Sequence, residues 1–227
     1  MTNLMYMQAP ECLQLKTKII GIITDQYGGV SLMLESTNFY VKGGGQLADT
    51  GVISASNFKA KVLNVIRDNT GAIYHICQVQ SGDPVIGQEV ECLVDKGSRD
   101  KNSKCHSGGH LIDLIVAQYA NSQLQPIKGC HYPGSCFIEY QVQNPDMFNL
   151  DGLKNYIENN MQSYIDADYK FAVSFNESNK IKKLKIGDFE SVACGGTHVK
   201  SSKELEGLNV YKIKYKKGNL KLSYKIV

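Results

Sequence analysis

The period of the hydrophobic pattern changes once along this chain, and that change limits the folds it can adopt. Before Asp95 apolar and polar residues alternate about every second residue, whereas after Asp100 apolar residues recur every three or four. The segment 95–100 itself is polar and charged. A length of 227 residues allows one large domain or two small ones. We therefore predict an α+β protein with a β domain over 1–95 and a helix-containing domain over 96–227.

The first of these domains is predicted to be a small antiparallel β-barrel. Gly-Gly, Asn-Thr-Gly and Ser-Gly-Asp stand between short alternating runs, which is the spacing typical of such barrels. The runs lie within 16–25, 28–41, 43–55, 58–71, 72–83 and 88–96. The third run starts with a glycine-rich loop at Gly43, Gly44 and Gly45.

The second domain combines helices with strands, which favours an α/β two-layer arrangement. Apolar spacing predicts helices over 103–121 and over 153–168, the latter capped by Asp151. CFIEYQV and FAVSFNE are typical of strands, and residues 211–227 alternate around Lys217-Gly218-Asn219 as a hairpin. The predicted core face of the hairpin holds Tyr211, Ile213, Tyr215, Leu220, Leu222, Tyr224 and Ile226.

Charge is distributed unevenly between the two ends of the chain. The net charge is +3, yet the residues from Lys180 onward hold 12 lysines and 4 acidic residues, a local charge of +8. The first 179 residues therefore carry −5. This asymmetry indicates a polyanionic partner for the lysine-rich C-terminal region, although a lysine face can also be simply solvated.

The composition excludes collagen-like, low-complexity and wholly disordered proteins. The fractions of hydrophobic residues (42%) and charged residues (21%) are those of an ordinary globular chain, and no apolar run reaches the roughly 20 residues of a membrane span. The N-terminal stretch lacks the pattern of a signal peptide. Seven cysteines without paired spacing favour reduced thiols. We expect a cytoplasmic protein without a membrane partner.

Three of the five histidines lie in two compact clusters, CHSGGH at 105–110 and CGGTH at 194–198. On a helix, His106 and His110 project from one face about 6 Å apart, and Cys194 and His198 repeat the same spacing. Three imidazoles and one thiolate would select zinc. The alternative, ordinary polar residues on a helix, stays open. A peptidase site is disfavoured because the general-base position of HExxH is Ser107 here.

These motifs together resemble a known family. HSGGHLI and ACGGTHV are similar to the two metal-binding elements of the editing domains of alanyl- and threonyl-tRNA synthetases. FYVKGGGQLADTG, residues 39–51, resembles the glycine-rich segment of the alanyl type, and KGNLKLSY resembles the closing hairpin. The resemblance is to freestanding AlaX proteins that carry an N-terminal barrel.

The resemblance implies a function and a set of site residues. The implied activity, which serves translation fidelity, is the hydrolysis of mischarged tRNA(Ala), chiefly seryl-tRNA(Ala) and possibly glycyl-tRNA(Ala), with tRNA and not DNA as partner. The implied zinc ligands are His106, His110, Cys194 and His198. Two sequence departures are Val41 in place of a proline and HSGGH in place of HTATH. At the position where relatives often have a polar residue that lines the amino-acid pocket, this chain has Ile127. Gln123 or Gln125 could take that place only if the loop is shifted.

The remaining site predictions follow from chemistry. Gln46 and Thr197 are candidate catalytic residues because both offer hydrogen bonds beside the predicted ligands. Asp49 and Cys105 are expected to be supporting or spectator residues, and Ser107 a helix residue and not a nucleophile. The expected substrate contacts are Gly43, Gly44, Gly45, Lys42 and Lys128. Phosphate contacts are expected from the hairpin lysines and from Lys180, Lys182, Lys183 and Lys185.

Two other functions remain as alternatives. One is a zinc-stabilised tRNA-binding module without hydrolytic activity. The other is editing of seryl-tRNA(Thr), which the GGGQ sequence makes less favourable.

Overall fold

The computed structural model describes residues 2–26, 29–120, 123–176, 178 and 181–227. These form two compact units. One comprises the chain up to Gly43 together with Leu47–Asp100, and the other comprises Gly44–Gln46 and Lys101–Val227. The glycine-rich loop is thus divided, because Gly44–Gln46 packs with the second unit.

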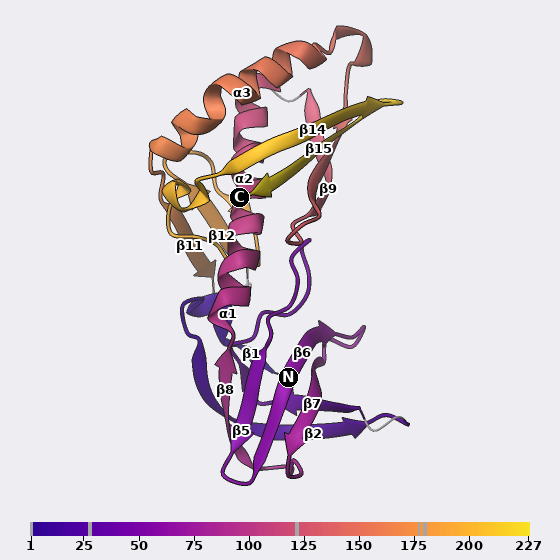
Figure 1. Cartoon of the computed structure of the whole chain (residues 1–227), viewed down its shortest axis with the longest axis vertical. Coiled ribbons are helices and arrows are strands. Elements are labelled where there is room, and N and C mark those ends of the chain that lie inside the picture. The colour runs from indigo at the N-terminus through magenta and orange to yellow at the C-terminus, as the bar shows by residue number, and fades with distance from the viewer. Residues whose placement is uncertain (1, 27–28, 121–122, 177, 179–180) are drawn as a thin grey trace. The chain divides into compact units, whose positions relative to one another are not determined.

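The first unit contains the predicted barrel. Six strands close in the order β2-β3-β7-β6-β5-β8, and all six pairings are antiparallel. Alternation builds it: in β6, Phe58, Ala60 and Val62 are buried while the residues between them face outward. The barrel strands are β2 (Gln14–Thr24), β3 (Val30–Leu34), β5 (Gly51–Ala55), β6 (Phe58–Arg67), β7 (Ile73–Ser81) and β8 (Glu89–Val94) (Figure 1). The unit also contains a short parallel pair, β1 (Asn3–Leu4) with β4 (Ser36–Thr37), and the helix α1 (Met5–Gln8).

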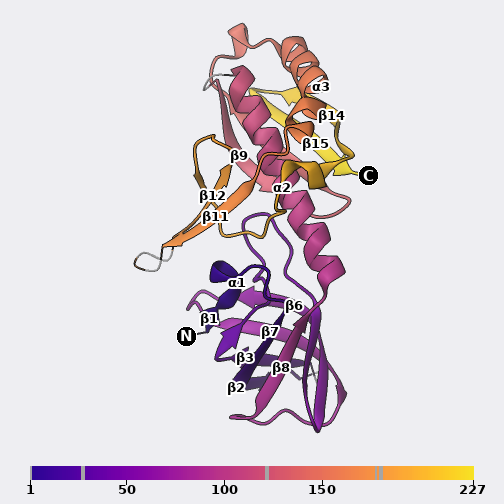
Figure 2. The same ribbon diagram turned by 90° about the vertical axis from the view of Figure 1, so that its left-hand side faces the viewer.

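The second unit places helices against an antiparallel sheet of order β14-β15-β10-β9 (Figure 2). Its core joins Ile112 of α2, Ile157 of α3, Tyr140 of β10 and Leu222 of β15. A three-stranded sheet, β11-β12-β13, completes the unit. The elements are α2 (Lys96–Ala120), β9 (Leu124–Cys130), β10 (Cys136–Val142), a 3-10 turn at Pro145–Met147, α3 (Leu150–Asp166), β11 (Phe171–Asn176), β12 (Ile181–Ile186), β13 (Val192–Ala193), a second 3-10 turn at Ser202–Leu205, β14 (Leu208–Lys216) and β15 (Asn219–Ile226).

Both long helices begin earlier than the sequence predicts. α2 starts at Lys96 and not at 103, because Asp95 accepts a hydrogen bond from Ser98 N at 2.9 Å and caps its first turn. The polar segment that the sequence predicts to be a boundary is therefore mostly helix. α3 starts at Leu150, because the side chain of Asn149, and not that of Asp151, caps the backbone N–H of Gly152.

Two strands and one side chain of the hairpin differ from the sequence prediction. The sequence pattern does not predict β9 or β12, because β9 contains a proline and a glycine and is mostly exposed, and the lysines of β12 are typical of a charged surface. The prediction for Tyr211 is wrong. A bulge between Val210 and Lys212 turns Tyr211 outward, leaving it 54% exposed, while Val210 packs on the core.

Within the part of the chain that the structure describes, neither α2 nor any other helix has the length and apolar character needed to cross a membrane.

Candidate metal centre

The two histidine clusters meet in the second unit. His106 and His110 lie one turn apart on α2, and Cys194 and His198 lie in the segment that follows β13. The distances from Cys194 Sγ are 3.3 Å to His110 Nε2, 3.3 Å to His198 Nε2 and 3.6 Å to His106 Nε2. The ligand atoms of His106, Cys194 and His198 all lie within 4.8 Å of one another.

These distances fit a metal ion. A tetrahedral ion with a metal–sulfur distance of about 2.3 Å and metal–nitrogen distances of about 2.0–2.1 Å holds sulfur and nitrogen about 3.5 Å apart. The observed separations of 3.3–3.6 Å bracket that value. Cys194 has only one S–H, so it can donate to one nitrogen at most. The His106, Cys194 and His198 cluster could therefore hold a metal ion. His110 Nε2 lies within 3.3 Å of the sulfur of this cluster.

A hydrogen-bond network fixes the orientation of His106. Its Nδ1 lies 2.7 Å from Gln46 Oε1, and an amide oxygen can only accept, so Nδ1 carries the hydrogen and Nε2 presents its lone pair toward Cys194. Gln46 Oε1 also accepts from Thr197 N at 3.1 Å, while Gln46 Nε2 donates to Thr197 Oγ1 at 2.8 Å. Ser103 Oγ lies 2.7 Å from the same Thr197 hydroxyl. Gln46 and Thr197 are both buried and hold the ring in place.

Ser107 supports the other cluster. Its Oγ accepts from Val199 N at 3.0 Å and lies 3.3 Å from His198 Nδ1. This contact leaves His198 Nε2 directed at Cys194. Ser107 is thus a helix residue with a positioning contact.

Burial keeps the imidazoles uncharged. It lowers the pKa of His110 to about 4 and lowers the pKa values of His106 and His198 well below the ordinary range, with neighbouring imidazoles adding to the effect. Burial raises the pKa of the Cys194 thiol, opposed by the Gly196 backbone N–H and the Lys182 ammonium. Neutral imidazoles are the form that binds metals.

Lys182 does not belong to an exposed phosphate-binding face. It is 3% exposed, and its Nζ donates to Gly196 O at 2.7 Å. Lys183 and Lys185 of the same strand are exposed, and Lys180 lies outside the described residues.

Part of the glycine-rich loop lies against the backbone that follows β9 in the second unit. His131 N donates to Gly45 O at 2.8 Å, and a Cβ at Gly45, whose φ is +75°, would lie 2.6 Å from Gly129 O. A Cβ at Gly196 would lie 2.0 Å from the His106 ring. Glycine at both positions is therefore required by close approach.

The other predicted substrate contacts are divided between the two units. Gly43 and Lys42 belong to the first unit, where Tyr40 OH donates to Gly43 O at 3.0 Å and Lys42 N donates to Val65 O at 2.9 Å. Lys128 is exposed on β9, with its Nζ 5.7 Å from the centre of the Phe137 ring.

Sequence reasoning misses His131. Its ring stacks on that of His106 with centroids 4.8 Å apart and planes at 17°. It is 7% exposed, and burial lowers its pKa to about 4. No spacing pattern could have found it, because it lies far in sequence from both histidine clusters. Ile127 is 50% exposed, and Gln125 accepts a hydrogen bond from Gln143.

Comparison with known proteins shows two groups of similar proteins. The family model described as "tRNA synthetases class II (A)" matches residues 10–98. The chain is 27% identical over 195 residues to the alanine–tRNA ligase of Clostridioides difficile, covering 78% of the chain and 22% of the ligase. It is therefore related to proteins that act on alanine tRNA.

The chain is also similar to two proteins that are named as alanyl-tRNA editing proteins. The chain is 27% identical over 231 residues to the alanyl-tRNA editing protein AlaX-L of Pyrococcus horikoshii, covering 97% of the chain and 56% of that protein. It is also 27% identical over 208 residues to AlaX-M of the same organism, covering 90% and 88%. These matches confirm the resemblance to the AlaX family. The chain spans about half the length of AlaX-L and about a fifth of the ligase.

Proposed function

We propose that the protein is a zinc-dependent trans-editing hydrolase that removes serine from mischarged tRNA(Ala), with glycyl-tRNA(Ala) as a second substrate. The observation that carries this proposal is the convergence of three imidazoles and one thiol in a chain similar to alanyl-tRNA editing proteins. An editing protein acts where tRNA is charged, so we expect it to work in the cytoplasm.

The donor set supports zinc as the metal. Three imidazole nitrogens and one thiolate suit zinc and disfavour magnesium and calcium, which prefer oxygen. His106, His110, Cys194 and His198 would hold it. When bound, zinc supplies positive charge that can polarise an oxygen atom and order the ligands around it. Because four side chains would fill a tetrahedral shell, an organising role is favoured over an open catalytic one.

The reaction is hydrolysis of an ester. Water oxygen forms a bond to the aminoacyl carbonyl carbon, the bond from that carbon to the ribose oxygen breaks, and the water's proton reaches the ribose oxygen. The products are free serine and uncharged tRNA. Gln46 Oε1 already accepts two hydrogen bonds and Thr197 Oγ1 lies within hydrogen-bond distance of two partners, so we assign both as positioning residues. Gly44, which is exposed and has a positive φ, is the glycine of this loop that we propose for contact with the aminoacyl end.

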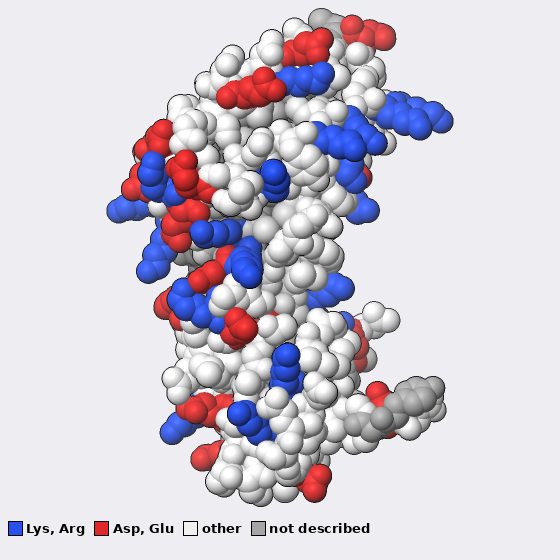
Figure 3. All heavy atoms as spheres, viewed as in Figure 1, with Lys and Arg blue, Asp and Glu red and all other residues white. Residues whose placement is uncertain are grey.

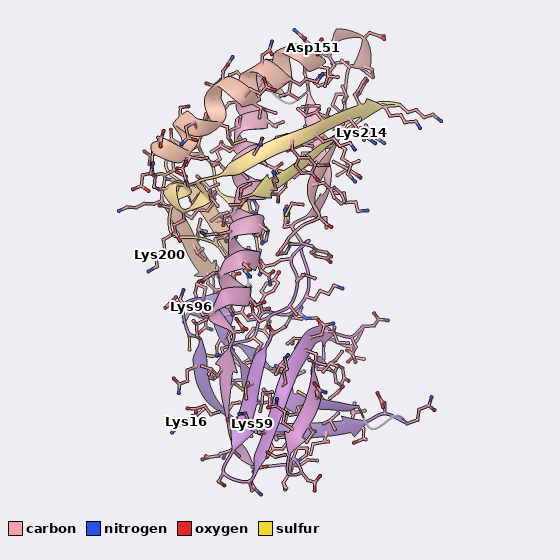
Figure 4. The ribbon with its side chains drawn as sticks, viewed as in Figure 1. Lys16, Lys59, Lys96, Asp151, Lys200 and Lys214 are labelled. Atoms are coloured by element: carbon pink, nitrogen blue, oxygen red, sulfur yellow. The ribbon has the colours of Figure 1, made fainter. Side chains whose placement is uncertain are left out.

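The lysine-rich hairpin supports a tRNA partner. Lys214 is labelled on this hairpin in Figure 4, and Figure 3 shows basic side chains gathered over it. Lys221 is paired with Glu139 at 3.0 Å and so contributes less free charge. Phosphate contacts of this kind make binding dependent on salt. The exposed lysines of the hairpin are Lys212, Lys214, Lys216, Lys217 and Lys225.

Deacylation assays test the proposal. Purified protein is incubated with seryl-, glycyl- and alanyl-tRNA(Ala) and with seryl-tRNA(Thr), and ester loss is followed over time. We expect release of serine while alanyl-tRNA(Ala) survives. Tight binding of seryl-tRNA(Ala) with its ester retained would instead establish a binding module, and clearance of seryl-tRNA(Thr) alone would change the tRNA assignment.

A further inference from the structure

His131, which follows β9, has a tautomer fixed by its surroundings. Its Nδ1 lies 2.5 Å from the hydroxyl oxygen of Tyr224, and that hydroxyl donates its hydrogen to Cys105 O at 2.8 Å. Since the Tyr224 hydrogen is committed, Nδ1 must be the donor in the His131–Tyr224 bond. The other ring nitrogen, Nε2, therefore carries a lone pair and is an acceptor.

Glycines surround the ring on both edges. A Cβ at Gly109 would lie 2.5 Å from His131 Cε1, and one at Gly129 would lie 2.7 Å from Nε2. A Cβ at Gly45 would lie 3.0 Å from Cδ2. A larger residue at 109 would therefore displace the ring, and a larger residue at 129 would cover the acceptor nitrogen. The second glycine of HSGGH, a departure from the family's HTATH, thus makes room for this imidazole.

The acceptor nitrogen is left without a protein partner. Among the described residues no hydrogen bond reaches His131 Nε2, yet this atom is not one of the fully buried polar atoms that lack a partner. It is therefore accessible, although the residue as a whole is 7% exposed. A lone acceptor in so enclosed a position can accept a hydrogen bond from a ligand that brings an O–H or N–H group.

Several other polar side chains around the cluster are already engaged, although among the described residues His110 Nδ1 also has no hydrogen-bond partner. The oxygen of Gln46 accepts two hydrogen bonds, and the hydroxyls of Ser103 and Ser107 contact Thr197 and His198. The position where relatives often carry a polar pocket residue is Ile127, whose side chain offers no hydrogen bond. His131 stacks on His106 and so lies beside the predicted reaction centre.

We propose that His131 is the residue that recognises the amino acid, with Nε2 accepting a hydrogen bond from the side-chain hydroxyl of the seryl group. This inference rests on the proposed editing function. An alanyl or glycyl group brings no hydroxyl, so it leaves the acceptor unpaired. A purely apolar pocket rejects an added hydroxyl only weakly, whereas a pocket that contains an acceptor for that hydroxyl can select for it.

The kinetic test compares seryl- with glycyl-tRNA(Ala). His131→Phe keeps the stacked ring and removes both nitrogens, and we expect kcat/KM for seryl-tRNA(Ala) to fall about tenfold to a hundredfold, while that for glycyl-tRNA(Ala) changes by less than about threefold. His131→Gln, which restores an acceptor, should recover part of the loss. Metal content should be unchanged throughout.

Two further variants sharpen the test. Gly109→Ala should reproduce the selective loss, because its Cβ meets the ring. His75→Phe is the matched control: His75 is a fully buried barrel histidine whose nitrogens lie 2.8 Å from Thr37 Oγ1 and 3.0 Å from Leu32 O, so its loss should leave selectivity intact. An equal fall for both substrates in His131→Phe would overturn the proposal and indicate a role in holding water or structure.

Binding separates this inference from the proposed function. Adenosine analogues carrying serine or alanine through a 3′-amide cannot be hydrolysed, and their affinities can be measured by calorimetry. We expect the natural protein to prefer the seryl analogue about tenfold or more and His131→Phe to lose that preference. Preference without ester hydrolysis would refute the hydrolase alone. Equal affinity of the natural protein for both analogues would refute the role of His131.

Discussion

Each of the two units buries a polar centre, and the two centres are built in opposite ways. In the barrel unit, Asp49 (0% exposed) is paired with Arg99 (4% exposed). Arg99 also donates to Pro10 O at 2.6 Å and Asn38 O at 2.8 Å, and Tyr40 N donates to Asp49 Oδ2 at 2.6 Å. The charges of Asp49 and Arg99 are satisfied within the protein, so this ion pair is closed, although the side-chain amide of Asn38 beside it is buried without a hydrogen-bond partner among the described residues.

The centre of the second unit is open. The nitrogens of His106, His110 and His198 face the sulfur of Cys194, which has one hydrogen to donate and can satisfy only one of them. The same comparison holds for single residues: both nitrogens of His75 in the barrel have partners, but among the described residues only one nitrogen of His131 does. Burial alone therefore does not mark a site. A site is marked where several lone pairs converge and outnumber the hydrogens that can satisfy them.

The largest expected effect comes from removing a member of the open centre. In His106→Ala and Cys194→Ala, metal content measured by mass spectrometry should fall from about one zinc per chain to below about 0.2, because removal of one of four ligands weakens binding strongly. Hydrolysis should disappear with it. The matched control is Cys12→Ala, since Cys12 lies in the first unit and its thiol donates to Gln14 O. Full metal content in both ligand variants would remove these residues from the site.

Breaking the closed centre should reduce stability without changing metal binding. Arg99→Met leaves the Asp49 carboxylate buried without its partner, which typically costs about 3–5 kcal/mol. Urea unfolding followed by circular dichroism measures the decrease. Lys203→Met, which removes a half-exposed ion pair with Asp166, should leave the midpoint nearly unchanged. A folded Arg99→Met protein that fails to bind metal would contradict the separation of the two centres.

A smaller effect is expected from the residue that orients His106. Gln46→Met removes the acceptor of His106 Nδ1–H, and removing such an acceptor typically weakens metal affinity or activity about 10- to 100-fold. Competition with a zinc-binding dye gives the affinity. Gln125→Met, which alters an exposed amide, is the control. Unchanged affinity and rate in Gln46→Met would show that His106 needs no such support.

The smallest effect concerns the charged surface. Replacing Lys214 and Lys216 of the hairpin by serine should reduce the slope of log affinity for tRNA against log salt by about 0.7–0.9 for each phosphate that the variant no longer neutralises. The matched control changes Lys59 and Lys61, exposed on β6 of the barrel, of which Lys59 is labelled in Figure 4. Equal slopes for the two pairs of variants would mean that the hairpin is a solvated face.

The sequence predicts those parts of the molecule that repeat or are regularly spaced. Alternation in segments such as 58–67 is enough to predict the barrel, and the i, i+4 spacing of His106 with His110 is enough to bring them to one helix face. The prediction of a phosphate contact at Lys182 is wrong because an alternating strand can bury an ammonium when a carbonyl such as Gly196 O accepts from it. His131 reaches the cluster only through tertiary packing, which leaves no periodic signal.

X-ray absorption at the zinc edge of the purified protein tests the central claim most directly. We predict one zinc per chain with one sulfur at about 2.3 Å and three nitrogens at about 2.0–2.1 Å. A sulfur shell that disappears in Cys194→Ser would assign that ligand. A metal shell without sulfur, or with more than one sulfur, would contradict the convergence of His106, His110, Cys194 and His198 on one ion.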